Sequence, residues 1–316
     1  MALSGKICLV TGASRGIGKG IAVQLGEAGA TVYITGRSSS PEAAVIGGSL
    51  KETADEITAK GGTGIAVICD HAEDEQVKQL FERIEHDHGR LDVLVNNAYS
   101  AVTAIVKETA RGHKFWQHEG EPGEFWDIVN LVGLRNHYIC SAYAAKMMVE
   151  VNQGLIVNVS SFGGTIYLFN TAYGVGKAAV DRMSSDMAHE LREFNVACVT
   201  VYPGAVLTET INHTLKQEKN EFLHRTFEDG ESPEYSGKAV VGLACDKNIL
   251  AKSGKVLLVA DLARQYGFTD VNGRQRPSAF QLNSLLARAG YSGLASIVPD
   301  FVRLPSFLIA MRSSKF

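Results

Sequence analysis

The sequence predicts an α/β fold in which helices cover both faces of a doubly wound, parallel, seven-stranded sheet. Two observations predict it. Short apolar runs bounded by glycine or polar residues recur along residues 1–260, as expected of strands buried on both faces. Amphipathic segments long enough for helices separate these runs, and such alternation is typical of parallel sheets. We therefore expect one domain over residues 1–260 and an extension over 261–316, where the alternation stops.

The expected strands are the apolar runs themselves: Ile7–Val10, Thr31–Ile34, Gly64–Cys69, Leu91–Val95, Leu155–Val159, Val196–Val201 and Lys255–Val259. The segments between them predict helices over Ile17–Ala28, Ser49–Lys60, Asp74–His88, Phe125–Val149, Ala172–Glu193 and Ser236–Ala244. The second helix opens with Ser49 three residues before Glu52, a capping-box pattern that favours a helix start.

Three long connections interrupt the alternation of strands and helices: Ser38–Gly48, Tyr99–Gly123 and Ala205–Pro233. Each follows a predicted strand, so each leaves the sheet at its carboxyl edge. Ligands of doubly wound sheets bind at that edge, and long loops in compact domains often carry function. We therefore expect the ligand site among these three connections.

Composition excludes several classes of protein. The 316 residues carry a formal net charge of −3, so the chain lacks the overall basic field of a nucleic-acid binder. The five cysteines are scattered without a C-x-x-C pair, and no histidine motif such as H-E-x-x-H occurs, so we expect no disulfide framework and no metal. The N-terminus lacks a signal-peptide pattern and no apolar run approaches 18 residues. These features predict an intracellular, cytoplasmic protein.

A glycine-rich segment, T-G-A-S-R-G-I-G at residues 11–18, stands between the first predicted strand and the first predicted helix. Glycine permits a sharp turn and a close backbone approach to a ligand. The N-terminus of the following helix then offers free N–H groups to a pyrophosphate. A tight turn without a ligand is the alternative, but the strand–loop–helix context favours dinucleotide binding. The expected contacts are Gly12, Ser14, Arg15, Gly16, Ile17 and Gly18.

The second predicted strand ends without the acidic residue that usually holds the ribose 2′-hydroxyl of NAD. Gly36 and Arg37 stand there instead, and Arg15 adds a second cation from the glycine-rich segment. A guanidinium pairs with a 2′-phosphate, whereas a carboxylate repels it. Both arginines could simply be solvated surface charges, but together they favour NADP(H) as the cofactor.

The order of further motifs resembles the short-chain dehydrogenase/reductase family, whose domain is a Rossmann-type sheet. These motifs are N-N-A at 96–98, W-D-I-V-N at 126–130, V-S-S-F-G-G at 159–164, Y-G-V-G-K at 173–177 and P-G-A-V-L-T at 203–208. The resemblance covers about residues 5–260. It implies four catalytic residues, Asn130, Ser161, Tyr173 and Lys177, and further cofactor contacts from Asp70, Asn97, Tyr173, Lys177, Pro203, Gly204, Val206 and Thr208.

The chain departs from the family pattern at two places. Tyr99 follows N-N-A where the family usually has glycine, so the loop after the fourth strand is expected to differ and Tyr99 to shape the substrate pocket. Asp261, Leu262 and Ala263 replace the usual D-G-G after the last strand, which leaves that turn and its contacts open.

The pair Tyr173 and Lys177 has a chemical rationale, because residues i and i+4 are neighbours on one helix face. A free phenol keeps its proton at neutral pH, so we expect the Lys177 ammonium and an oxidised nicotinamide to lower the pKa of Tyr173. Tyr173 would then donate a proton to a carbonyl oxygen that Ser161 also stabilises. The resemblance implies that Asn130 holds a water for proton resupply.

These features predict an NADPH-dependent carbonyl reductase, reversible as an alcohol dehydrogenase. The resemblance implies lipophilic substrates such as steroids, prostanoids or xenobiotic ketones and quinones. The alternative is an NADP-binding scaffold that acts through its C-terminal tail with little catalysis. The predicted helix that carries Asn130 also carries His137 and Cys140, and in this family that helix often packs subunits together. These two residues are therefore expected either in the core or at the interface of a homo-oligomer.

The last sixteen residues, 301–316, mix large apolar side chains with Arg303, Arg312 and Lys315. Such a segment either lies on a membrane surface, for example that of the endoplasmic reticulum, or packs on the domain or on a partner subunit; we favour packing. The final Ser-Lys-Phe resembles a peroxisomal tripeptide but lacks its leucine, so we discount that address.

Overall fold

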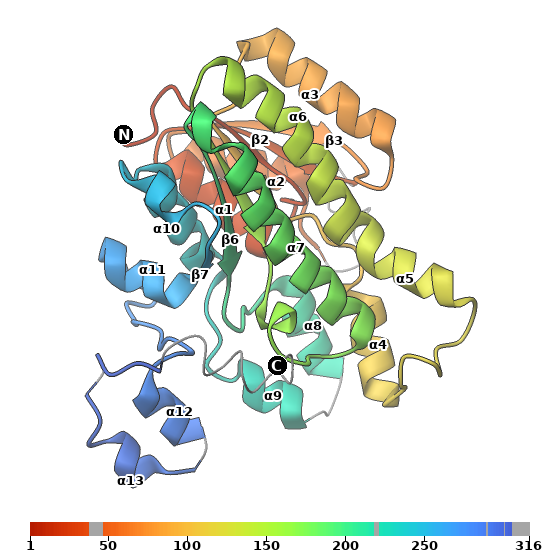
Figure 1. Ribbon diagram of the computed structural model, residues 1–316, viewed down its shortest axis with the longest axis vertical. Helices are drawn as coiled ribbons and strands as arrows, with labels where there is room; N and C mark the ends of the chain where they lie inside the picture. Colours follow the sequence, from red (N-terminus) through yellow and green to blue (C-terminus); the bar gives the residue numbers. More distant parts are fainter. Residues whose placement is uncertain (38–46, 218–220, 289, 300, 305–316) are drawn as a thin grey trace.

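Seven parallel strands form one sheet in the order β3-β2-β1-β4-β5-β6-β7, as the sequence predicts (Figure 1). The structure is a computed structural model that describes residues 1–37, 47–217, 221–288, 290–299 and 301–304. The strands are β1 (Ile7–Val10), β2 (Thr31–Gly36), β3 (Thr63–Ile68), β4 (Val93–Asn96), β5 (Gly154–Val159), β6 (Val196–Tyr202) and β7 (Val256–Leu258). The chain order reverses between β1 and β4, which opens a crevice at the carboxyl edge there.

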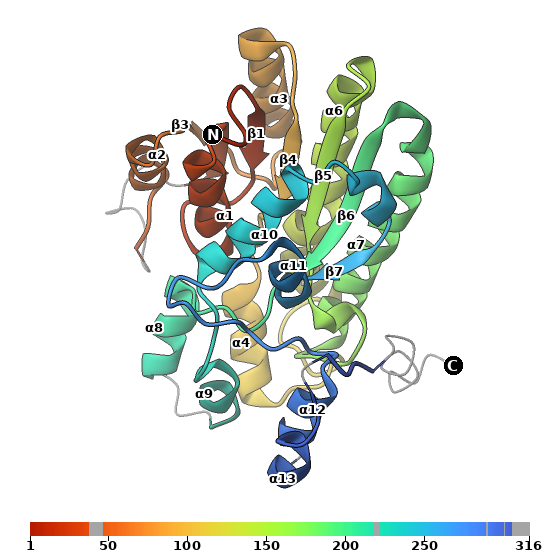
Figure 2. The same ribbon diagram turned by 90° about the vertical axis from the view of Figure 1, so that its left-hand side faces the viewer.

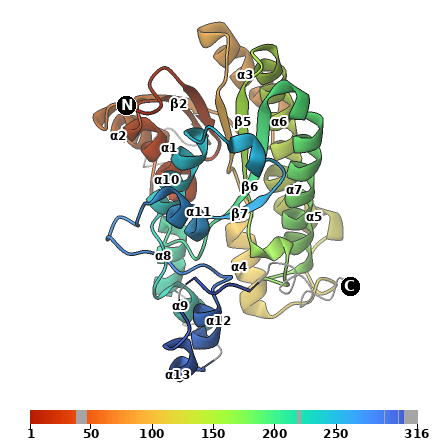
Figure 3. The same cartoon turned by 60° about the vertical axis from the view of Figure 1, so that its left-hand side comes forward.

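Helices cover both faces of the sheet (Figures 2 and 3). One layer contains α1 (Gly16–Glu27), α2 (Leu50–Ala59), α10 (Pro233–Ala244) and α11 (Val259–Tyr266); the other contains α3 (Asp74–His88), α6 (Asn136–Glu150) and α7 (Thr171–Glu190). Alternate strand residues therefore enter separate cores. Cys8 and Val10 of β1 pack under the first layer, and Ile7 and Leu9 pack under the second.

Side-chain caps define the starts of two helices near the site. The Ser49 hydroxyl accepts the Glu52 N–H at 3.1 Å, which confirms the cap predicted for α2. Asn170 caps α7 in the same way, because its side-chain oxygen accepts the Tyr173 N–H at 3.0 Å. This second cap fixes the first turn of α7, on which Tyr173 stands.

Two of the three long connections contain helices that the sequence did not predict. The second connection forms α4 (Val102–Arg111), and the third forms α8 (Glu209–Gln217) and α9 (Glu221–Phe227). These helices are short, and α8 buries none of its residues. They lie together below the carboxyl edge of the sheet (Figure 1). Residues 38–46 of the first connection lie outside the described residues.

The helix predicted over Phe125–Val149 is three consecutive segments. A π-helical turn, η2 (Leu131–Arg135), separates α5 (Pro122–Asn130) from α6. Such turns insert a residue into an α-helix and often occur at functional sites. Here the turn begins directly after Asn130, so it sets the direction of that side chain. Short 3-10 turns also occur at Phe162–Gly164, Arg192–Phe194 and Ile249–Lys252.

The predicted boundary at residue 260 falls within α11. Leu262 and Ala263, which follow that boundary, are buried, so the first residues of the extension pack on the sheet domain. Further on, Arg276 and Asp270 form a buried ion pair at 2.7 Å. Two short helices, α12 (Leu282–Arg288) and α13 (Ser292–Ala295), project at the lower end of the molecule (Figure 2). No helix in the described part of the chain is long and apolar enough to cross a membrane.

Candidate active site

Two hydroxyl groups meet at the carboxyl edge of the sheet. Ser161 follows β5, and its Oγ lies 2.6 Å from the Oη of Tyr173 on α7. The glycines around them make this approach possible: a Cβ on Gly163 would lie 2.4 Å from the Tyr173 ring. One substrate oxygen placed between the two hydroxyls could therefore accept a hydrogen bond from each.

Lys177 lies one turn further along α7, with 8% of its surface exposed. Its Nζ donates to the carbonyl oxygen of Val159 at 3.2 Å and lies 4.7 Å from the centre of the Tyr99 ring. The centre of the Tyr173 ring is 6.0 Å from Nζ. Burial lowers the pKa of Lys177 to about 8, although the Asp181 carboxylate acts in the opposite direction.

The expected lowering of the Tyr173 pKa depends on Lys177 together with an oxidised nicotinamide, and it stays a prediction. Burial raises the pKa of Tyr173, and the hydrogen bond with Ser161 only partly opposes that rise. The Lys177 ammonium donates to the Val159 carbonyl oxygen and lies over the Tyr99 ring. Desolvation of the phenol is the larger effect.

Asn130 completes the group of four residues that the sequence singles out. Its side chain is buried and donates from Nδ2 to the carbonyl oxygen of Ala172 at 3.4 Å. Gly176 is needed for this contact, because a Cβ there would lie 2.0 Å from Asn130 Oδ1. Asn130, Ser161, Tyr173 and Lys177 are thus all gathered around the first turns of α7.

Tyr99 fills the space beside this group. Its ring lies over the Lys177 ammonium, edge-to-face with Tyr173 at 6.2 Å between centroids. It also packs on the π-helical turn, where a Cβ on Gly133 would lie 2.3 Å from the ring. The Tyr99 hydroxyl is buried and has no hydrogen-bond partner among the described residues. The departure from glycine therefore places an aromatic wall against the buried lysine.

The glycine-rich segment forms a tight loop between β1 and α1. Gly12 and Gly16 have φ values of +65° and +59°, a region that favours glycine, and a Cβ on Gly18 would lie 2.4 Å from the Gly12 oxygen. Asn97 braces the loop by donating from Nδ2 to the carbonyl oxygens of Thr11 and Gly12 at 2.9 and 3.0 Å. The role of Asn97 in this structure is thus to support the loop.

A carboxylate contacts the same loop. The Gly16 N–H donates to Oε2 of Glu209 at 2.7 Å, and Arg15, the residue before α1, provides no side-chain cap. Thr208 caps α8 through its hydroxyl, which accepts the Ile211 N–H at 3.2 Å. The N-terminus of α1 therefore accepts an anion in this structure, as a pyrophosphate-binding loop must. Sequence reasoning missed Glu209, since no motif distinguishes it.

The predicted adenosine contacts surround this loop. Arg37 follows β2 and is exposed, and Arg15 is partly buried. Asp70 Oδ1 accepts the Ala72 N–H at 3.0 Å, so its side chain folds back on its own turn. The turning glycines and the Gly16 N–H that already holds a carboxylate fit the pyrophosphate of a nicotinamide dinucleotide. Ser14 and Ile17 are partly buried in the loop itself.

The segment Pro203–Thr208 is fastened by a buried carboxylate that the sequence did not reveal. Glu231 accepts the Gly204 N–H at 2.9 Å through Oε1, while its backbone pairs with Ala205 and Leu207. Burial raises the pKa of Glu231 to about 7. Val206 is buried beside this pairing and bridges Glu231 through the backbone. Glu231 therefore fixes the course of the predicted nicotinamide-binding segment.

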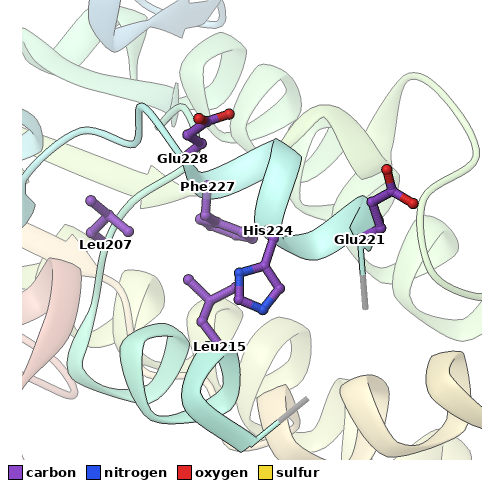
Figure 4. Close-up of a pocket in the computed structure, with 6 residues that line it drawn as sticks. All are labelled: Leu207, Leu215, Glu221, His224, Phe227 and Glu228. Carbon is purple, nitrogen blue, oxygen red and sulfur yellow. The ribbon is translucent and has the colours of Figure 1, made fainter. Parts of the chain in front are cut away.

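A hollow of about 750 Å³ lies beside that segment (Figure 4). Leu207, Leu215 and Phe227 supply its apolar lining. Glu221 and His224 on α9, and Glu228 just after that helix, supply polar groups. Figure 4 shows His224 directed toward Leu215, between α8 and α9. The apolar side of the hollow is therefore the side of Leu207, which belongs to the segment Pro203–Thr208.

This site, on this fold, defines a class of protein. A sequence profile described as short chain dehydrogenase matches residues 6–219. The chain belongs to the short-chain dehydrogenase/reductase family of oxidoreductases, which use nicotinamide cofactors.

Individual relatives agree with this assignment. The chain is 47% identical over 322 aligned positions to dehydrogenase/reductase SDR family member 1 of Homo sapiens and of Mus musculus, covering 99% of this chain and 99% of each relative. It is 28% identical to a 7alpha-hydroxysteroid dehydrogenase of Clostridium sardiniense, over 77% of this chain and 88% of that one. A crystal structure of a metagenomic short-chain oxidoreductase in complex with NADP has a TM-score of 0.61, at 28% identity and covering 82% of this chain and 98% of that one.

Proposed function

We propose that the protein is an NADPH-dependent reductase that converts carbonyl groups of lipophilic substrates to alcohols. The observation that carries the proposal is the 2.6 Å contact between Ser161 Oγ and Tyr173 Oη beside the buried Lys177. Two hydroxyls and an ammonium at one point suit a reaction in which a carbonyl oxygen gains negative charge. A scaffold that acts only through its tail has no use for this arrangement.

The chain's own residues perform the proton chemistry. Hydride for the carbonyl carbon comes from the reduced nicotinamide when the dinucleotide is bound. Tyr173 Oη gives its proton to the carbonyl oxygen, and Ser161 Oγ donates a hydrogen bond to that same oxygen. Lys177, with Nζ 6.0 Å from the centre of the Tyr173 ring, stabilises the phenolate that results. The raised pKa of the phenol keeps its proton in place until the oxygen develops charge.

Arg15 and Arg37 support NADPH rather than NADH as the physiological cofactor. Both flank the end of β2, where the chain has Gly36 in place of an acidic residue. The exposed Arg37 guanidinium can pair with a 2′-phosphate, and the metagenomic relative binds NADP. NADPH also favours the direction of reduction wherever its pool is kept reduced.

The hollow beside Leu207 supports a lipophilic substrate. Leu207, Leu215 and Phe227 offer apolar surface that a steroid-like or other extended ring system would bury. The relative named as a 7alpha-hydroxysteroid dehydrogenase makes steroids a reasonable first group to test.

A panel of carbonyl compounds tests the proposal. The purified full-length protein is mixed with NADPH or NADH, and cofactor oxidation is followed with steroids, quinones, aromatic ketones and short aldehydes. We expect NADPH oxidation with the larger apolar carbonyls and slower oxidation with short aldehydes. Cofactor binding without oxidation across the whole panel would favour the scaffold function instead.

A further inference from the structure

Three potential metal ligands meet at the end of α4, away from the hydroxyl pair. Glu108 stands in the last turn of that helix, and Gly112, with φ +67°, turns the chain back. The returning loop brings His113 Nδ1 to 3.0 Å and His118 Nδ1 to 2.7 Å from the same oxygen, Glu108 Oε2. The three ligand atoms all lie within 4.8 Å of one another.

We propose that Glu108, His113 and His118 bind a divalent transition metal ion of the Zn²⁺ class. Two imidazole nitrogens and one carboxylate oxygen are a common three-residue set for such ions, which leaves a fourth position for water. The set favours Zn²⁺, Cu²⁺ or Ni²⁺ over Mg²⁺ and Ca²⁺, which prefer all-oxygen ligands. The prediction of no metal rested on known sequence motifs, and the spacing Glu-x₄-His-x₄-His matches none of them.

The ligands are held in place before any ion arrives. Glu108 is 8% exposed, and the His118 ring stacks on Phe125 with centroids 4.0 Å apart and planes 17° apart. The other His118 nitrogen, Nε2, is buried without a hydrogen-bond partner among the described residues. The hydrogen bond to Glu108 is therefore the one that His118 makes through its ring in this part of the chain. Preorganised ligands lose little freedom on binding, which favours affinity.

The distances also suit an ion. Ligand atoms about 2.0–2.1 Å from a tetrahedral Zn²⁺ lie roughly 3.3 Å from each other. The contacts of 2.7 and 3.0 Å would therefore need to open by only a few tenths of an ångström. The ion would take the place of the hydrogen bonds that now join each imidazole to the carboxylate.

One neighbouring charge opposes the ion. Arg111 Nη1 lies 3.1 Å from Glu108 Oε1, and it also pairs with Glu119 at 3.1 Å. A guanidinium on the other oxygen of the ligating carboxylate reduces the affinity for a cation. This opposition provides a discriminating test, because loss of Arg111 should weaken a simple hydrogen-bonded cluster but strengthen a metal site.

The position of the site gives the ion a structural effect on the catalytic region. Phe125, on which His118 stacks, belongs to an apolar cluster with Tyr99, Phe169 and Tyr173. An ion that joins the end of α4 to the loop before α5 would hold Phe125 against that cluster. The apolar cluster that contains Tyr173 would become more rigid.

Metal titration of the chelator-treated, full-length protein tests the proposal. Calorimetry with Zn²⁺ and visible absorption with Co²⁺ should give one ion per chain. His118→Ala and Glu108→Gln should weaken binding by roughly tenfold or more, and Arg111→Ala should tighten it several-fold. Thermal melts of each variant without metal show whether it is folded.

Matched controls separate this site from incidental binding. His189→Ala removes an exposed histidine elsewhere, and Cys245→Ser removes the exposed thiol; neither should change the affinity. Absence of stoichiometric binding by the folded wild-type chain would overturn the proposal. So would binding that His118→Ala leaves intact, or that Cys245→Ser removes.

Discussion

The Gly16 N–H and the Glu209 carboxylate are 2.7 Å apart, although 193 positions separate them in the sequence. The contact joins the start of α8 to the start of α1. It places a carboxylate at the N–H groups where the fold offers a site for a pyrophosphate. Glu209 and the dinucleotide would therefore compete for the same donor, and α8 would move when the cofactor binds.

Replacing Glu209 by glutamine should strengthen cofactor binding. The amide retains the size of the side chain but removes the negative charge that competes with the pyrophosphate. We expect the Kd for NADPH to fall several-fold, measured by fluorescence titration. Glu85→Gln, on the exposed surface of α3, is the matched control and should leave the Kd unchanged. Weaker NADPH binding by Glu209→Gln would mean that Glu209 supports the site.

Arg37→Asp should shift cofactor preference from NADPH toward NADH. The substitution replaces an exposed cation after β2 by a carboxylate that repels a 2′-phosphate and can hold a ribose hydroxyl. We expect the ratio of the two Kd values to change by at least tenfold. An unchanged ratio would show that the Arg37 side chain does not reach the 2′ position.

Tyr99→Phe and Tyr99→Ala should have opposite effects on stability. The Tyr99 hydroxyl is buried without a partner among the described residues, so removing it should stabilise the protein by about 1 kcal/mol. Removing the ring that packs on Gly133 should cost about 3–5 kcal/mol. Urea unfolding measures both. A clear loss of stability in Tyr99→Phe would indicate that the hydroxyl has a partner.

The Tyr99 ring also helps to bury the Lys177 ammonium and should therefore affect the pKa of Lys177. Burial lowers the pKa of Lys177 to about 8, so the buried ammonium loses its proton as pH rises through that value. Tyr99→Ala admits water to Nζ and should move the transition to higher pH, toward the ordinary lysine pKa of 10.5. The pH dependence of the reduction rate reports this shift, and Tyr99→Phe should leave it in place.

Glu231 should make the folded state less stable as pH rises. Burial raises its pKa from 4.5 to about 7, so its contribution is complete below pH 4.5 and is lost as pH rises through 7. Each pKa unit corresponds to about 1.4 kcal/mol, so the loss is about 3 kcal/mol. Glu231→Gln keeps an acceptor for the Gly204 N–H but removes this titration.

Comparing the wild type with Glu231→Gln gives the contribution of the Glu231 carboxyl group to the pH dependence of stability. Asp270 and Arg276, the charged neighbours of Glu231, are present in both, so their own pH dependence cancels in the difference. Free energies of unfolding are measured from pH 4.5 to pH 8. Parallel curves for wild type and Glu231→Gln would show that the carboxyl group does not titrate in this range.

The sequence predicted those features that depend on local pattern. All seven strands follow from apolar runs. The pairing of Ser161 with Tyr173 was implied by the resemblance of their motifs to those of the family. The motif Y-G-V-G-K located Lys177, but it did not predict that the Tyr99 ring lies over the Lys177 ammonium. Tyr99 belongs to the connection after β4, which is distant from the motif in the sequence.

The features that the sequence did not predict depend on how loops fold in space. Glu209 meets Gly16, Glu231 meets Gly204, and two histidines meet Glu108 only because the long connections fold back in space. The π-helical turn after Asn130 has the same apolar pattern as an ordinary helix, so its extra residue is visible only in the structure.

The rate of NADPH oxidation by Tyr173→Phe, with a carbonyl substrate accepted by the wild type, tests the central claim most directly. The variant keeps the ring that packs against Gly163 and Tyr99 but lacks the hydroxyl 2.6 Å from Ser161. We expect the rate to fall by roughly 10²–10⁴-fold while NADPH binding is retained, because only the proton donor is lost. A rate equal to that of the wild type would contradict the account.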